Sequence, residues 1–528
     1  MHSCLLISEL ILHIIGFIAD DGTSGGYRCL KNTRDLARLA RTCKAIMEPA
    51  LDVLWKTQHS LSPLVMCLPS DLWEKDAVNA IYFTRDVTPK DWDWMQRYSH
   101  RIHRISHPKM FSLPKLDEAV LRAIFTPAIF SALFPCLHTI DYSVISVASS
   151  TIPLLNNLLS PRLTSVSFAL PRDSAYDAVY SLFDAIPRKA GMMQSLRIDS
   201  FVYSSQLEVR FAEKDLPDLR DLLLSYNVRV SSQSLHHLAS LRYLQQLNLR
   251  LPTDLDDACL ALSAQRALFP ALQHLKINAH TLPQCTALLA CISSPNLEGV
   301  SFSYDIQAPS SVLTAFLSQV HKTSNTAPSF RTVSLRHNLQ LNSSSDPPFI
   351  FAPPTFAPLL SCHALRTIKL VHLGTLDLDD AFMGRAARAW SNLEELKMCS
   401  LAWSESHRTT LGSVRELAKW CRKLRKLHMA FDGTAVPEVD ADASGGGLLK
   451  LGSKSESGSE SETGYASTSL EVLNVRDSQI EDPEEVAKFL SEIAPGLKAI
   501  HVEGCSETWK MWRAVESCLE DARKSLTS

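Results

Sequence analysis

The amino-terminal stretch of the chain is almost continuously apolar. Between positions 5 and 18 the exceptions are Ser8, Glu9, His13 and Gly16. A surface helix that faces one core needs only three or four apolar residues per two turns. The pattern therefore predicts a short helix whose apolar surface exceeds what a small module can bury.

A second apolar pattern recurs from residue 137 to the end of the chain. It has the form L-x-x-L-x-L, with aliphatic or aromatic substitutes, and its last two apolar positions alternate with polar ones, as in a half-buried strand. The copies start at Leu137, Leu163, Met193, Leu219, Leu244, Leu272, Leu297, Phe330, Leu365, Leu393, Leu424, Leu470 and Leu497. Ile102 and Ile105 suit a degenerate first copy.

The segments between copies often show a helical pattern, as at 285–292 and 414–420. One strand and one helix cannot bury their own apolar faces, so neighbouring units must stack. The chain resembles a leucine-rich-repeat protein, which predicts an α/β solenoid with parallel strands on a concave face and helices outside. The asparagine or cysteine usual after the strand is matched only at Asn227, Asn338 and Cys505, so we expect irregular repeats.

The amino-terminal residues resemble the F-box family. The matching positions are Ile7-Ser8-Glu9-Leu10, Leu39, Cys43-Lys44 and Leu54-Trp55, and the departures are Ser8 for a proline and Ile46 for an aromatic. The resemblance implies an all-α F-box-like module over 1–56 that docks on a Skp1-like adaptor and, through it, on a cullin. This is the substrate-recognition subunit of an SCF-type E3 ubiquitin ligase.

Apolar residues of this module form the predicted adaptor interface, because exposed apolar surface usually marks a protein-binding site. They are Leu6, Ile7, Leu10, Ile14 and Leu39. Ser8 in place of proline is expected to loosen the helix start and weaken binding. The alternative is that Leu5, Leu6, Leu10 and Ile14 pack on the repeats behind them.

The remaining boundaries follow from composition. Residues 57–135 are predicted to be a helical connector, and Thr88-Pro89-Lys90-Asp91 has the N-cap, proline and carboxylate that open a helix. The solenoid is predicted over 136–528, with a disordered loop at 433–468 that is too polar to fold. Ser457 and Ser459 each precede a glutamate by three residues; they are either phosphorylation sites or part of a solvated acidic linker.

Composition narrows the class of protein. A formal net charge of −3 argues against nucleic-acid binding, and thirteen scattered cysteines without a C-x-x-C pair suit reduced thiols in the cytosol or nucleus. The apolar run is too short and too interrupted for a membrane span. His100, His103 and His107 alternate with arginines, which disfavour a metal cation. No catalytic motif stands in the chain, so we expect neither an enzyme nor a cofactor.

The predicted target site is a set of cations beside the strand positions of the later repeats. They are Arg250, Lys276, Arg336, Lys369, Lys397, Lys426 and Arg476, whereas the early copies place Asp141, Asp199 and Asp221 there, with Arg197 the one cation. We expect these cations to bind an acidic or phosphorylated segment of a protein target. The alternatives are ordinary solvated charges, and a repeat scaffold or inhibitor with no ligase role.

Overall fold

The computed structural model describes residues 7–19, 30–106, 114–142, 152–170, 176–200, 208–212, 215–225, 228–252, 268–338, 349–400, 408–437, 469–503 and 506–527. The chain forms two compact units, Met1–Arg250 and Leu251–Ser528. Leu6 and His107 lie outside the described residues. Among those described, no helix is both long and apolar enough to cross a membrane.

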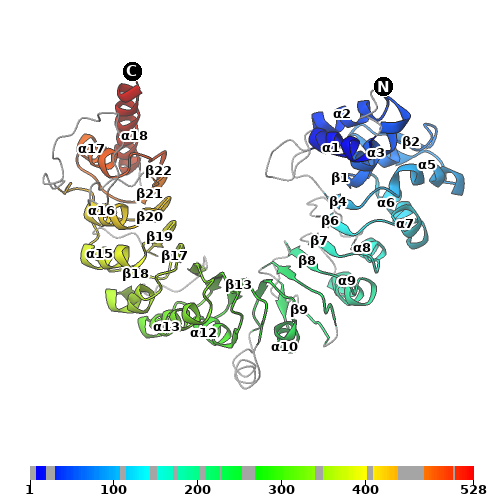
Figure 1. The fold of residues 1–528 in the computed structure, drawn as a ribbon. Helices are drawn as coiled ribbons and strands as arrows, with labels where there is room; N and C mark the ends of the chain where they lie inside the picture. Colours follow the sequence, from blue (N-terminus) through cyan, green and yellow to red (C-terminus); the bar gives the residue numbers. More distant parts are fainter. Residues whose placement is uncertain are drawn as a thin grey trace. The chain divides into compact units, whose positions relative to one another are not determined.

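The first unit begins with three helices that pack on one another (Figure 1). They are α1 (Ser8–Ala19), α2 (Leu30–Leu39) and α3 (Lys44–Lys56). Their shared core consists of Ile11, Ile15, Leu36, Ala40 and Ala50. This small core uses only part of the apolar surface that α1 offers, because the helix is apolar on more than one side.

A connector follows the helical module. Its elements are α4 (Ser62–Val65), β2 (Trp73–Lys75), β3 (Ala80–Phe83), α5 (Pro89–Ser99), β5 (Lys115–Leu116), α6 (Glu118–Ile124) and α7 (Pro127–Leu133). The strands form a small sheet in the order β2-β3-β5. Thr88 and Asp91 form the capping box that opens α5, as the sequence predicts.

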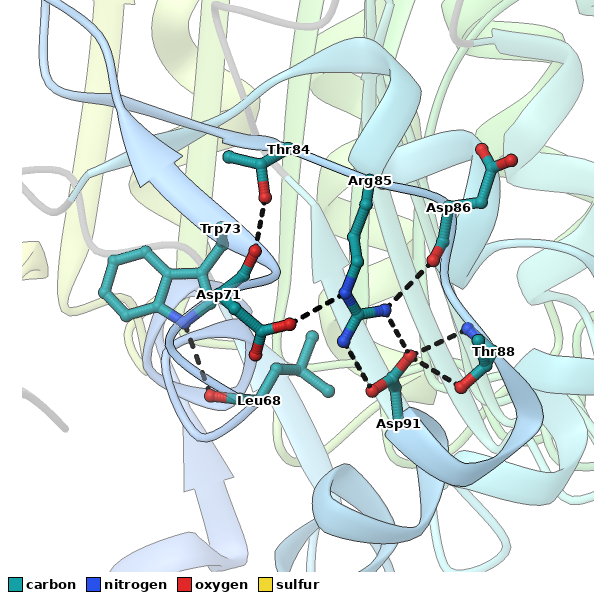
Figure 2. Close-up of polar contacts among 8 residues, drawn as sticks. All are labelled: Leu68, Asp71, Trp73, Thr84, Arg85, Asp86, Thr88 and Asp91. Atoms are coloured by element: carbon teal, nitrogen blue, oxygen red, sulfur yellow. Dashed lines mark hydrogen bonds and ion pairs between the residues drawn. The ribbon is translucent and has the colours of Figure 1, made fainter.

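One arginine ties the start of α5 to the β2–β3 hairpin (Figure 2). Arg85 donates two hydrogen bonds to Asp91, at 2.8 and 3.1 Å, and one from Nε to Asp71 at 2.9 Å. Asp91 also accepts the backbone N–H of Thr88. These donors hold the pKa of Asp91 well below its usual value, with the Arg85 hydrogen bond the largest cause.

A parallel ladder fills the rest of the first unit. It runs β1 (Thr57–Gln58), β4 (Arg104–Ser106), β6 (Thr139–Tyr142), β7 (Ser165–Leu170), β8 (Ser195–Ser200), β10 (Asp221–Leu224) and β12 (Gln246–Arg250). The short strand β11 (Arg229–Val230) pairs with β12, and β9 (Glu208–Val209) pairs with β11. Helices α8 (Ile152–Leu158), α9 (Tyr176–Lys189) and α10 (Ser232–Ser240) alternate with the later strands. The degenerate copy at Ile102 and Ile105 thus supplies β4, a strand of this ladder.

The second unit repeats the arrangement. Its ladder runs β13 (His274–Ala279), β14 (Gly299–Tyr304), β15 (Thr332–His337), β17 (Thr367–Val371), β19 (Glu395–Cys399), β20 (Lys426–Met429), β21 (Val472–Arg476) and β22 (Ala499–Val502). Its helices are α12 (Leu282–Cys291), α13 (Ser310–Thr326), α14 (Ala357–Leu360), α15 (Asp380–Ala389), α16 (Leu411–Trp420), α17 (Pro483–Ile493) and α18 (Ser506–Thr527), with the 3-10 helix η3 (Pro353–Phe356) before α14. A small side pair joins β16 (Ile350–Phe351) to β18 (Thr375–Leu376).

The α/β leucine-rich-repeat prediction is confirmed. Each of the thirteen predicted copies coincides with a ladder strand, and helices cover one face of the strands in each unit (Figure 1). In β13, Leu275 and Ile277 are buried while Lys276 between them is exposed, as alternation along a strand requires. We call the face away from the helices the open face; it is the face expected to be concave.

Two details differ from the sequence prediction or lie beyond it. The loop predicted over 433–468 begins later, because Gly433 donates its N–H to Gln479 O at 2.9 Å and bridges Ile480. Residues 438–468, including both candidate phosphorylation sites, lie outside the described residues. The predicted boundaries at 56 and 135 stay predictions.

Candidate functional site

The first candidate surface is an apolar stripe on α1, consisting of Ile7, Leu10, Ile14 and Phe17. These side chains are 47, 44, 44 and 71 % exposed. Their spacing of three, four and three residues places them along one side of a helix. Ile11 and Ile15, which turn toward the module core, are 5 and 0 % exposed. The helix therefore packs with one side and leaves a second apolar side open.

The sequence reasoning identified three of the four residues of the α1 stripe and missed Phe17. Phe17 is seven residues after Leu10, so the same helical spacing could have found it. Leu39 is half-buried against the module core and contributes less open surface than predicted. Leu12 is also exposed but lies about 200° around the helix from Leu10.

The helical module is fastened to the connector within the first unit. The rings of Trp55 on α3 and Tyr98 on α5 stack with centroids 5.0 Å apart. Arg101, just after α5, pairs with Glu48 and Asp52 on α3. These contacts fix α3 against α5, so a partner bound to the module would be held in a defined place on this unit.

The second candidate surface is the open face of the second unit. Strand pairing places one residue of each strand in a single row across this face. The row, called the central row, is Lys276, Ser301, Ser334, Lys369, Lys397, His428, Asn474 and His501. Neighbouring strands lie about 4.8 Å apart, so Lys369, Lys397 and His428 are direct neighbours.

The other predicted cations do not share this row. Arg336 lies two residues further along its strand, beside Ser303. Lys426 lies in the row before, beside Glu395, whose carboxylate also pairs with Lys369 at 2.8 Å. Arg250 ends β12 and belongs to the first unit. The seven predicted cations therefore do not form one continuous row. Those of the second unit lie in three rows, and Arg250 lies in the first unit.

Arg476 is a correction to the predicted register. The sequence predicted a target-binding cation on the open face, and the structure shows that its side chain is only 9 % exposed. The strand pairing shifts between Asn474 and Arg476, and Arg476 has a φ of 53°, in the left-handed region that non-glycine residues seldom adopt. The bulge re-aims the arginine toward the residue that follows β22.

That residue is Glu503, which receives three groups from neighbouring strands. Asn474 donates a hydrogen bond to it at 3.0 Å, and the nearest nitrogens of His428 and Arg476 lie 3.5 Å from its oxygens. The Glu503 N–H also donates to Arg476 O at 2.9 Å. Although partial burial acts to raise it, the pKa of Glu503 is lowered by these partners and by Lys397.

The histidines beside Glu503 show how positive this site is. Burial, followed by the charge of Lys397, lowers the pKa of His428 to about 4, although Glu503 acts in the opposite direction. Burial also lowers the pKa of His372, and the next causes are Arg336, Arg476 and Lys397. Both imidazoles are therefore neutral at pH 7, and the charged groups acting on them are three cations and one carboxylate.

The open face of the first unit is different in charge. Arg197 and Asp199 on β8 pair with each other at 2.9 Å. Burial raises the pKa of Asp221 on β10. Apart from Arg250, which ends the first unit, the change from acidic early copies to basic later copies that the sequence indicates follows the division into two units.

Metal binding has no support among the residues that the structure describes, where no group of three or more His, Cys, Asp or Glu side chains could hold a metal ion. The expectation of no cofactor stays a prediction. His100 instead contacts Gln96 O at 2.7 Å, and His103 packs edge-on against His138.

The similarity of this chain to known proteins is at the level of structure. No protein-family model and no curated protein matches the chain. The crystal structure of the Rad7 and Elc1 complex in yeast aligns over 73 % of this chain and 87 % of that chain, at 16 % identity and a TM-score of 0.37. The TLR13–ssRNA13 complex aligns over 77 % and 61 %, at 13 % identity and a TM-score of 0.29. These scores are too low to carry an argument, so the fold rests on the strand ladders themselves.

Proposed function

We propose that this chain is the substrate-recognition subunit of an SCF-type ubiquitin ligase. Its amino-terminal module would bind a Skp1-like adaptor, and its repeats would bind a protein target. The observation that supports this best is the α1 stripe, an open apolar side on a helix whose adjacent side is already packed. A folded module gains nothing from such a surface unless a partner covers it.

The energetics suit a partner helix or groove. Fully burying one aliphatic or aromatic side chain contributes about 1.5–3 kcal/mol. Four residues of the α1 stripe, about half exposed on average in the unbound chain, supply several such increments. Charged residues are absent from these four positions, so an apolar partner surface would meet no desolvation penalty there.

The proposed mechanism is proximity. The adaptor would tether the chain to a cullin and a RING subunit, and the open faces of the repeats would hold the target near the ubiquitin-loaded enzyme. Holding two reactants together converts a bimolecular step into an effectively unimolecular one. This chain would form no covalent intermediate and would need no cofactor.

The basic open face of the second unit supports an acidic or phosphorylated target. Lys276, Lys369 and Lys397 share the central row, and Lys369 alone of these has a close carboxylate partner, Glu395, among the described ion pairs. Surface charges of one sign raise the local concentration of an oppositely charged ligand. The alternative role of these lysines is to keep the surface solvated.

Co-purification tests the ligase assignment against its rival, a repeat scaffold or inhibitor. The full chain is co-expressed with a Skp1-like adaptor and purified through a tag on the chain. The proposal expects a stoichiometric complex that survives size-exclusion chromatography. A chain that elutes folded and without adaptor would favour the scaffold.

A further inference from the structure

The site around Glu503 differs from the rest of the basic open face, because polar side chains of several strands converge on one carboxylate. His428 and Asn474 come from neighbouring strands in the central row, and Arg476 is re-aimed by the bulge after Asn474. Side chains of His428 and Arg476 are only 13 and 9 % exposed, whereas that of Glu503 is 44 % exposed. The positive and donor groups thus form the floor of the site, and the carboxylate lies above them.

The charges of this site do not balance. Two cations (Lys397 and Arg476) and one carboxylate, Glu503, act on His428, which leaves a formal excess of +1, since two minus one is one. One hydrogen-bonding atom on the floor also lacks a bond. His428 Nε2 is buried and 3.5 Å from Glu503, but makes no hydrogen bond among the described residues.

We infer that Lys397, His428, Asn474 and Arg476 bind one doubly charged oxyanion, the phosphoryl group of a phosphorylated target segment, and that Glu503 occupies this place in the unbound chain. The inference rests on the proposed function, because it assigns the open face to a protein target. A phosphoryl group offers more acceptor oxygens than a carboxylate and a charge near −2 at neutral pH. It therefore matches the charge of +2 that Lys397 and Arg476 leave once Glu503 is displaced.

Glu503 is suited to be displaced. It follows the last residue of β22, and its side chain reaches the site from the edge of the ladder. Its 3.5 Å separations from His428 and Arg476 are longer than good charge-assisted hydrogen bonds, which measure about 2.7–2.9 Å. A ligand with better hydrogen-bond geometry could replace these contacts. A target that carries only a single carboxylate would not displace Glu503, so the site would exclude it.

The test measures binding of inorganic phosphate to the full chain at pH 7.5 by calorimetry. Glu503→Gln keeps an acceptor for Asn474 but removes the competing charge. We expect it to bind phosphate about fivefold to tenfold more tightly than the wild type, the effect of one partly exposed ion pair or slightly more. Adding Lys397→Gln should abolish the gain, whereas adding Lys322→Gln, on the outer helix α13, should leave it.

Three results would overturn the inference. They are an unchanged phosphate affinity in Glu503→Gln, no loss on adding Lys397→Gln, and an equal loss on adding Lys322→Gln. If Glu503→Gln does not fold, as circular dichroism would show, the wild type is compared with Lys397→Gln alone, and equal phosphate affinities then refute the site.

A second arm identifies the source of the phosphoryl group. A phosphoserine peptide with neutral flanking residues is compared with its unphosphorylated form and with inorganic phosphate. We expect the phosphopeptide to bind most tightly. Inorganic phosphate binding as tightly as the phosphopeptide would assign the site to the free ion and refute the target segment. None of these measurements needs the adaptor, so their failure is distinct from failure to co-purify with it.

Discussion

At the scale of the residue, cations at similar positions of different repeats can differ in how exposed they are. Arg476 and Lys397 both flank buried strand residues, yet one is nearly buried beside Glu503 and the other lies half-exposed in the central row. The sequence could not distinguish them because a β-bulge shifts the register by one residue, and nothing in Val475–Arg476–Asp477 marks it. His428 was likewise predictable as an open-face residue, but not as a neutral one.

The neutral His428 predicts a pH dependence of stability. Its folded pKa of about 4 lies below the ordinary value of 6.5, so the unfolded chain takes up the proton first as the pH falls. The contribution of His428 to the free energy of unfolding is fully present above pH 6.5 and is lost between pH 6.5 and 4. By pH 5 the loss is on the order of 1–2 kcal/mol.

His428→Asn, which does not titrate, should therefore lose less stability than the wild type between pH 7.5 and 5. Thermal unfolding at the two pH values checks this. Other histidines whose pKa is lowered by burial, such as His337 and His372, keep contributing in the variant, so a residual loss is expected. An identical loss in both proteins would contradict the assignment.

At the scale of the element, the sequence predicted most of what the structure shows. The alternation L-x-x-L-x-L located thirteen ladder strands, because buried and open positions differ sharply in a strand covered on one side only. It did not locate the two-residue strands β1, β9 and β11. The Thr88-Pro89-Lys90-Asp91 pattern located the start of α5, since capping is a local interaction. The partner of Asp91 was not predictable, because Arg85 reaches it from the hairpin.

Asp91→Ala should destabilise the connector by about 2–4 kcal/mol, because it removes the N3 carboxylate of the α5 capping box and leaves Arg85 without its main partner. Asp86→Ala is the matched control. Figure 2 shows the Asp86 carboxylate turned away from Arg85, which contacts only its backbone oxygen. Chemical denaturation should therefore find the control within about 0.5 kcal/mol of wild type; equal effects would refute the role of the network.

At the scale of the whole molecule, the chain combines two surfaces of opposite character. The α1 stripe is apolar, and the open face of the second unit is basic. Composition alone concealed both, because the net charge of −3 averages acidic early copies with basic later ones. The apolar excess in 5–18 did predict an open side on α1, but which residues form it depended on how the module packs.

The basic face predicts salt-sensitive target binding. Reversing Lys276, Lys369 and Lys397 to glutamate together should weaken binding of an acidic target at least tenfold and leave adaptor binding intact, because single exposed pairs contribute only about 0–1 kcal/mol each. Lys322, Lys488 and Lys510, exposed on α13, α17 and α18, form a control triple with the same change in net charge. Affinity should also fall as salt screens these charges. A target indifferent to salt and to the first triple would contradict the prediction.

Binding of a purified Skp1-like adaptor to the full chain, measured by calorimetry, tests the central claim most directly. Leu10→Asp places a charge in the α1 stripe, and Leu12→Asp makes the same change on the same helix at a position 52 % exposed outside it. The account predicts nanomolar to micromolar binding by the wild type and by Leu12→Asp, and at least a hundredfold weaker binding by Leu10→Asp, since a buried unpaired charge costs several kcal/mol. A folded wild-type chain that does not bind the adaptor, or a Leu10→Asp variant that binds as tightly as Leu12→Asp, would contradict it.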